Sequence, residues 1–163
     1  MTVDSLSRGG PERYALWAAG LGVLDLLVAR LLPGGVAAST LSLLISLALL
    51  AVAALAGLAA SRRGQRPGWA GALPGLVYGL VSGLDAFYQR VSLSDARTIV
   101  QHESASGARL TPEQFMQAAN APSTHLFQFL IGALFLAVFG IIVGSLAVMF
   151  VRRFLPALAR GQG

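Results

Sequence analysis

Two aspartates lie inside long apolar segments of this sequence, and each is followed five positions later by an arginine. Residues 24–30 read LDLLVAR and residues 84–90 read LDAFYQR, so both follow the pattern Leu-Asp-x4-Arg. An acid is costly in hydrocarbon, and an ionisable residue at membrane depth is by default a candidate site for a proton or a cation. Asp25 and Asp85 are therefore the first residues whose chemistry needs an explanation.

The arginines of the two segments suggest a structural explanation for these acids. Five residues rotate a helix by about 500°, which leaves each aspartate roughly 140° away from the arginine of its own segment. Arginine side chains lean toward the N-terminus of a helix, which brings them closer to the depth of an aspartate on a neighbouring helix. We therefore expect crossed pairs. One joins Asp25 to Arg90. The other joins Asp85 to Arg30. Ion or proton binding by the aspartates and a coincidental repeat stay open as alternatives.

A line of polar side chains runs along the third apolar segment and includes one of these acids. The spacing i, i+4, i+7 and i+11 places them within an arc of about 60° on a helix. The stripe consists of Tyr78, Ser82, Asp85 and Gln89, and a weaker one in the second segment consists of Ser39, Ser42 and Ser46. Polar side chains at membrane depth must face protein or water. We expect hydrogen bonds between helices, with a hydrated path as the alternative.

Glycines recur at every fourth position along the same third segment and predict close helix packing. They are Gly71, Gly75, Gly79 and Gly83, and the fourth segment has Gly132, Gly140 and Gly144 as a counterpart. Small residues four apart let two helix backbones approach, which favours the association of helices in lipid. We expect this glycine-xxx-glycine packing within one molecule, with self-association of two chains as the alternative. Pro74 predicts a kink in the same helix.

The composition indicates a membrane protein. Of the 163 residues, 55% are hydrophobic and only 12% are charged, compared with about 25% charged in soluble domains. The apolar residues gather into four segments that reach the length of about 20 residues needed to cross a bilayer. The expected spans are residues 14–32, 37–60, 69–88 and 126–151 of a single membrane domain, residues 1–163. The expected fold class is an all-α integral membrane protein with four transmembrane helices in a bundle.

The longest polar stretch, residues 90–124, connects the third and fourth spans. Thr111 is a suitable N-cap, with a proline next to it and Gln114 at the third helical position, as a capping box requires. We expect a short helix there, ended by Pro122. Residues 94–103 are expected to continue the third span as a helix.

The arginines set the expected orientation in the membrane, because cytoplasmic loops carry an excess of basic residues. With a cytoplasmic N-terminus, the cytoplasmic side holds Arg8, Arg13, Arg62, Arg63, Arg66, Arg152, Arg153 and Arg160, and the outer side holds Arg30, Arg90, Arg97 and Arg109. This distribution predicts a multi-pass protein of the cytoplasmic (inner) membrane with both termini in the cytoplasm. The net charge of +5 lies mostly at the ends of the spans, so we expect no nucleic acid partner.

Few other residues suggest chemistry. The chain has no cysteine, which excludes disulfides and thiolate catalysis. His102, Glu103 and His125 lack the spacing of a metal site, and we expect all three in a solvated loop. The sequence contains no nucleophile motif, phosphate-binding loop or pair of catalytic carboxylates in a polar setting. We therefore expect no enzyme, no cofactor and no bound metal.

The order of features in the second half of the chain is similar to that of a known family. A glycine-rich third span ends in Asp85, Phe87 and Tyr88, a helix start LTPEQFMQ follows at residues 110–117, and an uncharged span ends FGIIVGSLAVMFVRRF at residues 139–154. Over about residues 69–154 this pattern resembles the bacterial four-span membrane proteins called domain of unknown function 4199. The resemblance implies a bacterial membrane protein of this architecture, and it assigns no site residues.

Two functions fit these features. The first is a structural or accessory membrane subunit without catalytic activity, in contact with the lipid bilayer and with a second copy or another membrane protein as a candidate partner. The alternative is a small oligomeric transporter or channel, coupled to ions or protons, that uses Asp25 and Asp85. Water reaching the stripe from Tyr78 to Gln89 would favour the alternative, and a dry, packed stripe would favour the first.

Overall fold

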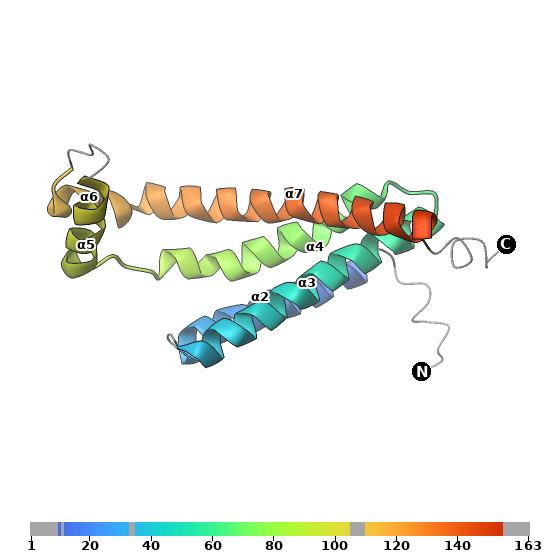
Figure 1. Ribbon diagram of the computed structural model, residues 1–163, viewed down its shortest axis with the longest axis horizontal. Helices are drawn as coiled ribbons and strands as arrows, with labels where there is room; N and C mark the ends of the chain where they lie inside the picture. Colours follow the sequence, from blue (N-terminus) through green and yellow to red (C-terminus); the bar gives the residue numbers. More distant parts are fainter. Residues whose placement is uncertain (1–9, 11, 33–34, 105–109, 155–163) are drawn as a thin grey trace.

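The computed structural model describes residues 10, 12–32, 35–104 and 110–154, and this part of the chain is helical (Figure 1). The long elements are α2 (Glu12–Leu31), α3 (Val36–Arg62), α4 (Pro67–Ser82) with its 3-10 continuation η1 (Gly83–Phe87), and α7 (Pro122–Phe154). Two short helices, α5 (Leu93–Ser104) and α6 (Pro112–Ala119), lie between η1 and α7. Arg8, Arg109, Arg160 and the side chain of Glu103 fall outside the described residues.

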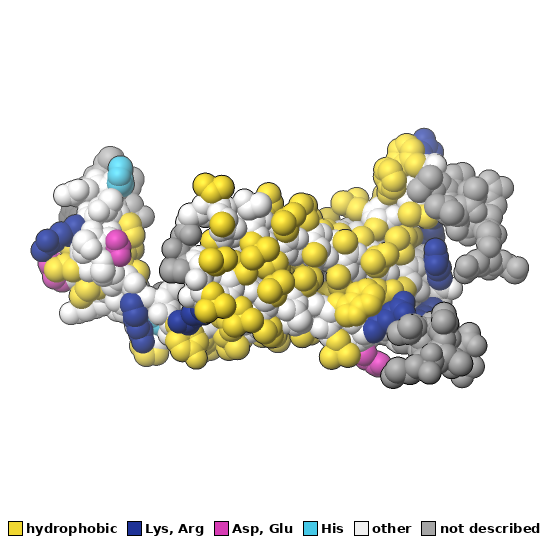
Figure 2. Space-filling view, turned by 90° about the horizontal axis from the view of Figure 1, so that it is seen from below, with side chains coloured by type: hydrophobic (Ala, Val, Ile, Leu, Met, Phe, Trp, Pro, Cys, Tyr) yellow, Lys and Arg dark blue, Asp and Glu magenta, His cyan; other side chains and the backbone are white. Residues whose placement is uncertain are grey.

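Four helical segments are long and apolar enough to cross a membrane. They are Glu12–Leu31, Val36–Arg62, Pro67–Phe87 and Pro122–Phe154. Large apolar side chains cover their outer faces, as at Phe135, which is 66% exposed. Figure 2 shows hydrophobic side chains over the middle of the visible face and arginines toward both ends. The prediction of an all-helical chain with four candidate membrane spans is confirmed.

α4 is the central long helix. It lies along α7 and also packs against α2 and α3, and α2 lies along α3 (Figure 1). α2 begins and α7 ends at the same end of the molecule, together with the connection from α3 to α4. This end, which we call the basic end, carries Arg13, Arg62, Arg63, Arg66, Arg152 and Arg153. The other end holds η1, and the hairpin of α5 and α6 projects beyond it.

α4 and α7 approach each other backbone to backbone. A Cβ atom placed on Gly71 would meet the carbonyl oxygen of Gly140, and one placed on Gly75 would meet that of Leu136. These two positions therefore leave no room for a side chain unless the helices move apart. Pro74, between them in sequence, is one of the most completely buried residues.

A core of apolar side chains joins α2, α3 and α4. Its buried members are Ala18, Val28, Ile45, Leu49 and Tyr78. Tyr78 is the largest of them and carries the only hydroxyl group in this set, so its position requires a hydrogen-bond acceptor nearby. That acceptor is part of the site described below.

The short helix α6 begins as the sequence predicts. The hydroxyl of Thr111 accepts a hydrogen bond from the backbone N–H of Gln114 at 3.3 Å, and the Gln114 side chain accepts one from the backbone N–H of Thr111 at 3.1 Å. Both donors would otherwise lack an intrahelical partner. The capping box is confirmed.

Two boundaries differ from the prediction. Residues 88–92 leave the helix, and α5 is a separate element, so the expected helical continuation of the third span over residues 94–103 is wrong. Pro122 follows the end of α6 and also begins α7, because proline suits the first turn of a helix. The fourth helix therefore starts four residues before the expected span.

Candidate polar site between α2, η1 and α7

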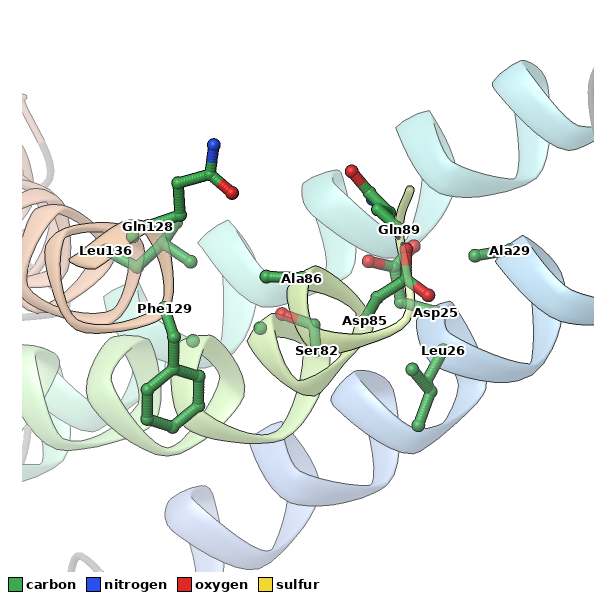
Figure 3. A pocket seen from close by; sticks show the side chains of 13 residues that line it. Asp25, Leu26, Ala29, Ser82, Asp85, Ala86, Gln89, Gln128, Phe129 and Leu136 are labelled. Atoms are coloured by element: carbon green, nitrogen blue, oxygen red, sulfur yellow. Dashed lines mark hydrogen bonds between the residues drawn. The ribbon is translucent and has the colours of Figure 1, made fainter. Parts of the chain in front are cut away.

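A polar cavity of about 310 Å³ lies between α2, η1 and α7, at the end of the spans opposite the basic end (Figure 3). Its polar lining residues are Asp25, Ser82, Asp85, Gln89 and Gln128, with apolar walls from Leu26, Phe129 and Leu136. Figure 3 shows the two aspartates and Gln89 close together on one side and Gln128 with Phe129 on the other. The cavity thus collects both acids that the sequence singled out.

Asp25 connects three helices. One carboxylate oxygen accepts a hydrogen bond of 2.8 Å from the hydroxyl of Tyr78 on α4, and the other accepts one of 3.2 Å from Ser42 on α3. Within the part of the chain that the structure describes, these two hydroxyl groups are its side-chain partners. Hydroxyl donors satisfy a carboxylate without bringing a second charge into the apolar band.

Asp85 connects η1 to α2. One of its oxygens lies 3.5 Å from Nε of Arg30, and the other accepts a hydrogen bond of 2.7 Å from the side chain of Gln89. The guanidinium of Arg30 also lies over the ring of Tyr88, 4.2 Å from its centroid. The side chain of Asp85 is 23% exposed and that of Arg30 is 42% exposed, so this ion pair sits at the rim of the spans rather than in a closed interior.

The other crossed pair does not form, and the expectation that Asp25 meets Arg90 is wrong for this structure. Arg90 donates to the backbone carbonyl of Asn120 at 3.3 Å and lies 3.1 Å from Nε2 of His125. The cause is the chain after Phe87, which leaves the helix and carries Arg90 out of the spans toward the α6–α7 junction.

The predicted polar stripe is interrupted where α4 ends at Ser82. The hydroxyl of Ser82 donates to the backbone carbonyl of Tyr78 at 2.9 Å, within its own helix. Two serines of the weaker stripe on α3 also bond their own helix, Ser39 to the carbonyl of Gly35 and Ser46 to that of Ser42. Of the residues in the two stripes, Tyr78 and Ser42 donate hydrogen bonds to another helix, and Gln89 donates one to Asp85.

The predicted packing glycines have three kinds of surroundings: backbone atoms of another helix, an aromatic ring, or open space. Gly71, Gly75, Gly79, Gly140 and Gly144 face backbone atoms across a helix contact, and Gly83 faces the ring of Phe129. Gly132 has open space where a Cβ would be, because it lies in the wall of the cavity. The expectation that Gly132 packs against another helix is therefore wrong.

The sequence analysis missed the cavity residue Gln128 and the packing of two residues outside the cavity, His125 and Gly57. His125, expected in a solvated loop, lies on α7 and is only 5% exposed. Its Nε2 lies 3.1 Å from the guanidinium of Arg90, and its Nδ1 is buried without a hydrogen-bond partner among the described residues. Gln128 was visible as a lone amide in an apolar span. Gly57, whose Cβ would lie 2.6 Å from Cα of Gly144, had no neighbouring glycine pattern to mark it.

The arrangement holds its two carboxylates with donors from neighbouring helices and leaves a cavity beside them. Asp25 lies six residues before the end of α2, about 9 Å along the helix axis. Asp85 lies two residues before the end of its span, whereas Asp25 is nearer the middle of α2 than its end. Among the described residues, no group of three or more His, Cys, Asp or Glu side chains could hold a metal ion.

Compared with models of known protein families, with curated proteins and with solved structures, the chain matches none of them.

Proposed function

We propose that this chain is an integral protein of the cytoplasmic membrane, with both termini in the cytoplasm, that acts as a structural or accessory subunit without catalytic activity. The observation that carries the proposal is the engagement of both acids by side chains of other helices. Asp25 accepts hydrogen bonds from α3 and α4, and Asp85 pairs with Arg30 of α2. An acid held in this way fixes how helices sit against one another, which is a structural role.

The distribution of charge supports the membrane orientation. Among the described arginines, six lie at the basic end and three, Arg30, Arg90 and Arg97, lie at or beyond the other end. Trp17 and Trp69 are more than half exposed near the basic end, where amphipathic rings favour a membrane–water interface. The excess of arginine at the basic end favours its placement in the cytoplasm.

Exchanging the two charges of the Arg30–Asp85 pair tests the structural role. Arg30→Asp and Asp85→Arg each leave two like charges side by side, whereas the double variant restores an ion pair of opposite polarity. We expect the double variant to recover about 0.5–1 kcal/mol relative to the sum of the single losses, the range of a partly exposed pair. Thermal unfolding of the purified protein in detergent measures this coupling. Additive losses would refute the structural role of the pair.

The cavity favours a second candidate function, a small oligomeric carrier or channel for protons or cations. Its two carboxylates line a volume of about 310 Å³, enough for several water molecules. This function requires wild-type protein in proteoliposomes to move protons or cations. It also requires the exchanged pair, although stable, to lose that movement. If the protein is a structural subunit, neither the wild type nor the exchanged-pair variant moves protons or cations.

A further inference from the structure

A second hollow lies at the basic end, on the opposite side of the membrane band from the polar cavity. It has a volume of about 420 Å³ and lies between the start of α2 and the last turns of α3. Its basic residues are Arg13, Arg62 and Arg63, and its other lining residues are Tyr14, Leu55, Leu58 and Ala59. Three arginines therefore line the hollow together with an apolar wall.

The charged part of this hollow suits a phosphate group. Arg62 and Arg63 end α3 and are exposed, and Arg13 comes from the facing helix α2. Arg13 donates to the hydroxyl of Tyr14 at 2.7 Å, and its Cζ lies 4.7 Å from the centroid of the same ring. Tyr14 is buried, so it holds one guanidinium at the rim. Arginine is the residue best suited to bind phosphate oxygens in pairs.

The remaining charges near the hollow keep it positive. Glu12 is the acidic residue of the first turn of α2 and the nearest described acid in sequence. Among the described residues at this end, Glu12 is the one acid, and Arg66, Arg152 and Arg153 add their charges to those of the three lining arginines. A concave surface with charges of one sign concentrates the counter-ion.

The apolar part of the hollow distinguishes a lipid from a free anion. Leu58 and Leu55 precede Arg62 by four and seven residues, which places them about 6 and 10 Å deeper along α3 in the direction of the apolar band. Leu55 is 47% exposed. A ligand that fills the hollow must therefore combine an anionic phosphate at the arginines with a hydrocarbon chain along the leucines.

We propose that this hollow binds the phosphate of an anionic phospholipid, with one acyl chain lying along Leu58 and Leu55. The site rests on the proposed membrane location, because its apolar wall is useful only in contact with the lipid phase. Basic pockets between membrane helices on the cytoplasmic side recognise lipid headgroups in this way.

Native mass spectrometry of the full-length protein tests the site, with phosphatidylglycerol and phosphatidylcholine added at equal concentration. We expect the wild type to retain phosphatidylglycerol in preference, and R62Q/R63Q to lower its affinity about tenfold or more, because two charge-assisted contacts are lost. The matched control is R152Q/R153Q, which removes the same charge at the same end from residues outside the hollow. It should keep the preference.

A second variant separates the lipid from free phosphate. Leu58→Trp fills the apolar wall without changing charge, and we expect it to weaken phosphatidylglycerol binding while leaving competition by inorganic phosphate unchanged. Three results would overturn the proposal: no preference in the wild type, equal losses in the two arginine pairs, or inorganic phosphate binding as tightly as phosphatidylglycerol. The first result leaves membrane insertion intact if alkaline-washed membranes retain the protein. Release into the alkaline wash would instead refute the membrane location and the lipid site together.

Discussion

The hydroxyl of Tyr78 ties α4 to α2, because it donates to Asp25 at 2.8 Å from a buried position. Replacing Tyr78 with phenylalanine keeps the ring and removes this donor, so among the described side chains Asp25 keeps the longer bond from Ser42. We expect Tyr78→Phe to lower the free energy of unfolding by about 1–2 kcal/mol, the upper range of hydrogen bonds between membrane helices. Thermal unfolding in detergent, followed by circular dichroism, measures the loss.

Tyr88→Phe is the matched control for this variant. It deletes the same hydroxyl from a tyrosine that is 65% exposed, and it leaves the ring face available to Arg30. We expect a change within about 0.5 kcal/mol, as for other surface substitutions. Equal losses in the two variants would contradict the role of Asp25 as a joint between helices.

At the residue scale, spacing indicated which acids need partners but not which donors meet them. The crossed pairs assumed that the third span stays helical as far as Arg90. The 3-10 turn and the non-helical residues after it redirect the chain, so Arg90 joins Asn120 and His125 instead of Asp25. The hydroxyl groups of Ser42 and Tyr78 were visible as members of two stripes. The stripe identifies which face of a helix is polar. Which acid that face contacts depends on how the helices pack.

At the scale of helices, the contact between α4 and α7 depends on positions where no side chain fits. Gly75→Ala places a methyl group against the carbonyl oxygen of Leu136 and forces the helices apart. We expect a loss of about 1–3 kcal/mol in the free energy of unfolding, the usual range for an overpacked contact. The same thermal unfolding experiment in detergent measures it.

Gly132→Ala provides the matched control on α7. Nothing lies within 4 Å of the position that its methyl group would take, and alanine favours a helix more than glycine does. We expect this variant to be as stable as the wild type or slightly more stable. A neutral Gly75→Ala would mean that α4 and α7 are not in backbone contact at this level.

The glycine pattern predicted a close-packing face on α4 because a repeat of four residues in the sequence is enough to place glycines along one side of a helix. It did not predict which glycines of α7 lie opposite. Gly140 and Gly144 do, whereas Gly132 lies where the cavity separates α7 from α2 and η1. Gly57 shows the converse, since this lone glycine on α3 makes a backbone contact with Gly144 that is closer than the contact of Gly79 in the repeat. The kink expected at Pro74 stays a prediction.

For the whole molecule, the absence of cysteine from the sequence makes orientation directly measurable. A single cysteine can be placed at the basic end with Gln65→Cys and beyond the opposite end with Ser94→Cys, both at exposed positions. In intact cells we expect a membrane-impermeant maleimide to label Ser94→Cys at once and Gln65→Cys only after permeabilisation. The reverse pattern would place both termini outside the cell.

The four candidate spans could be predicted because an apolar run of about 20 residues can be recognised by its length and composition alone, whatever packs against it. The arrangement of the helices could not, since leucine-rich faces pack equally well against lipid and against one another. His125 illustrates the same limit on a smaller scale. His125 is buried because α6 and the chain after η1 come together around it. The residues next to it in the sequence do not indicate this contact.

The length of α7 has a mechanical consequence. Its 33 residues extend for about 50 Å, roughly 20 Å more than the hydrocarbon thickness of a bilayer. Four residues of α7, about 6 Å, join the α5–α6 hairpin to the expected span that begins at residue 126, so a tilt of α7 is transmitted to the hairpin. A change of 10° in its tilt about the middle of the helix would displace each end by about 4 Å. A thinner or thicker bilayer, which alters the tilt of a long helix, would therefore move the hairpin across the membrane surface.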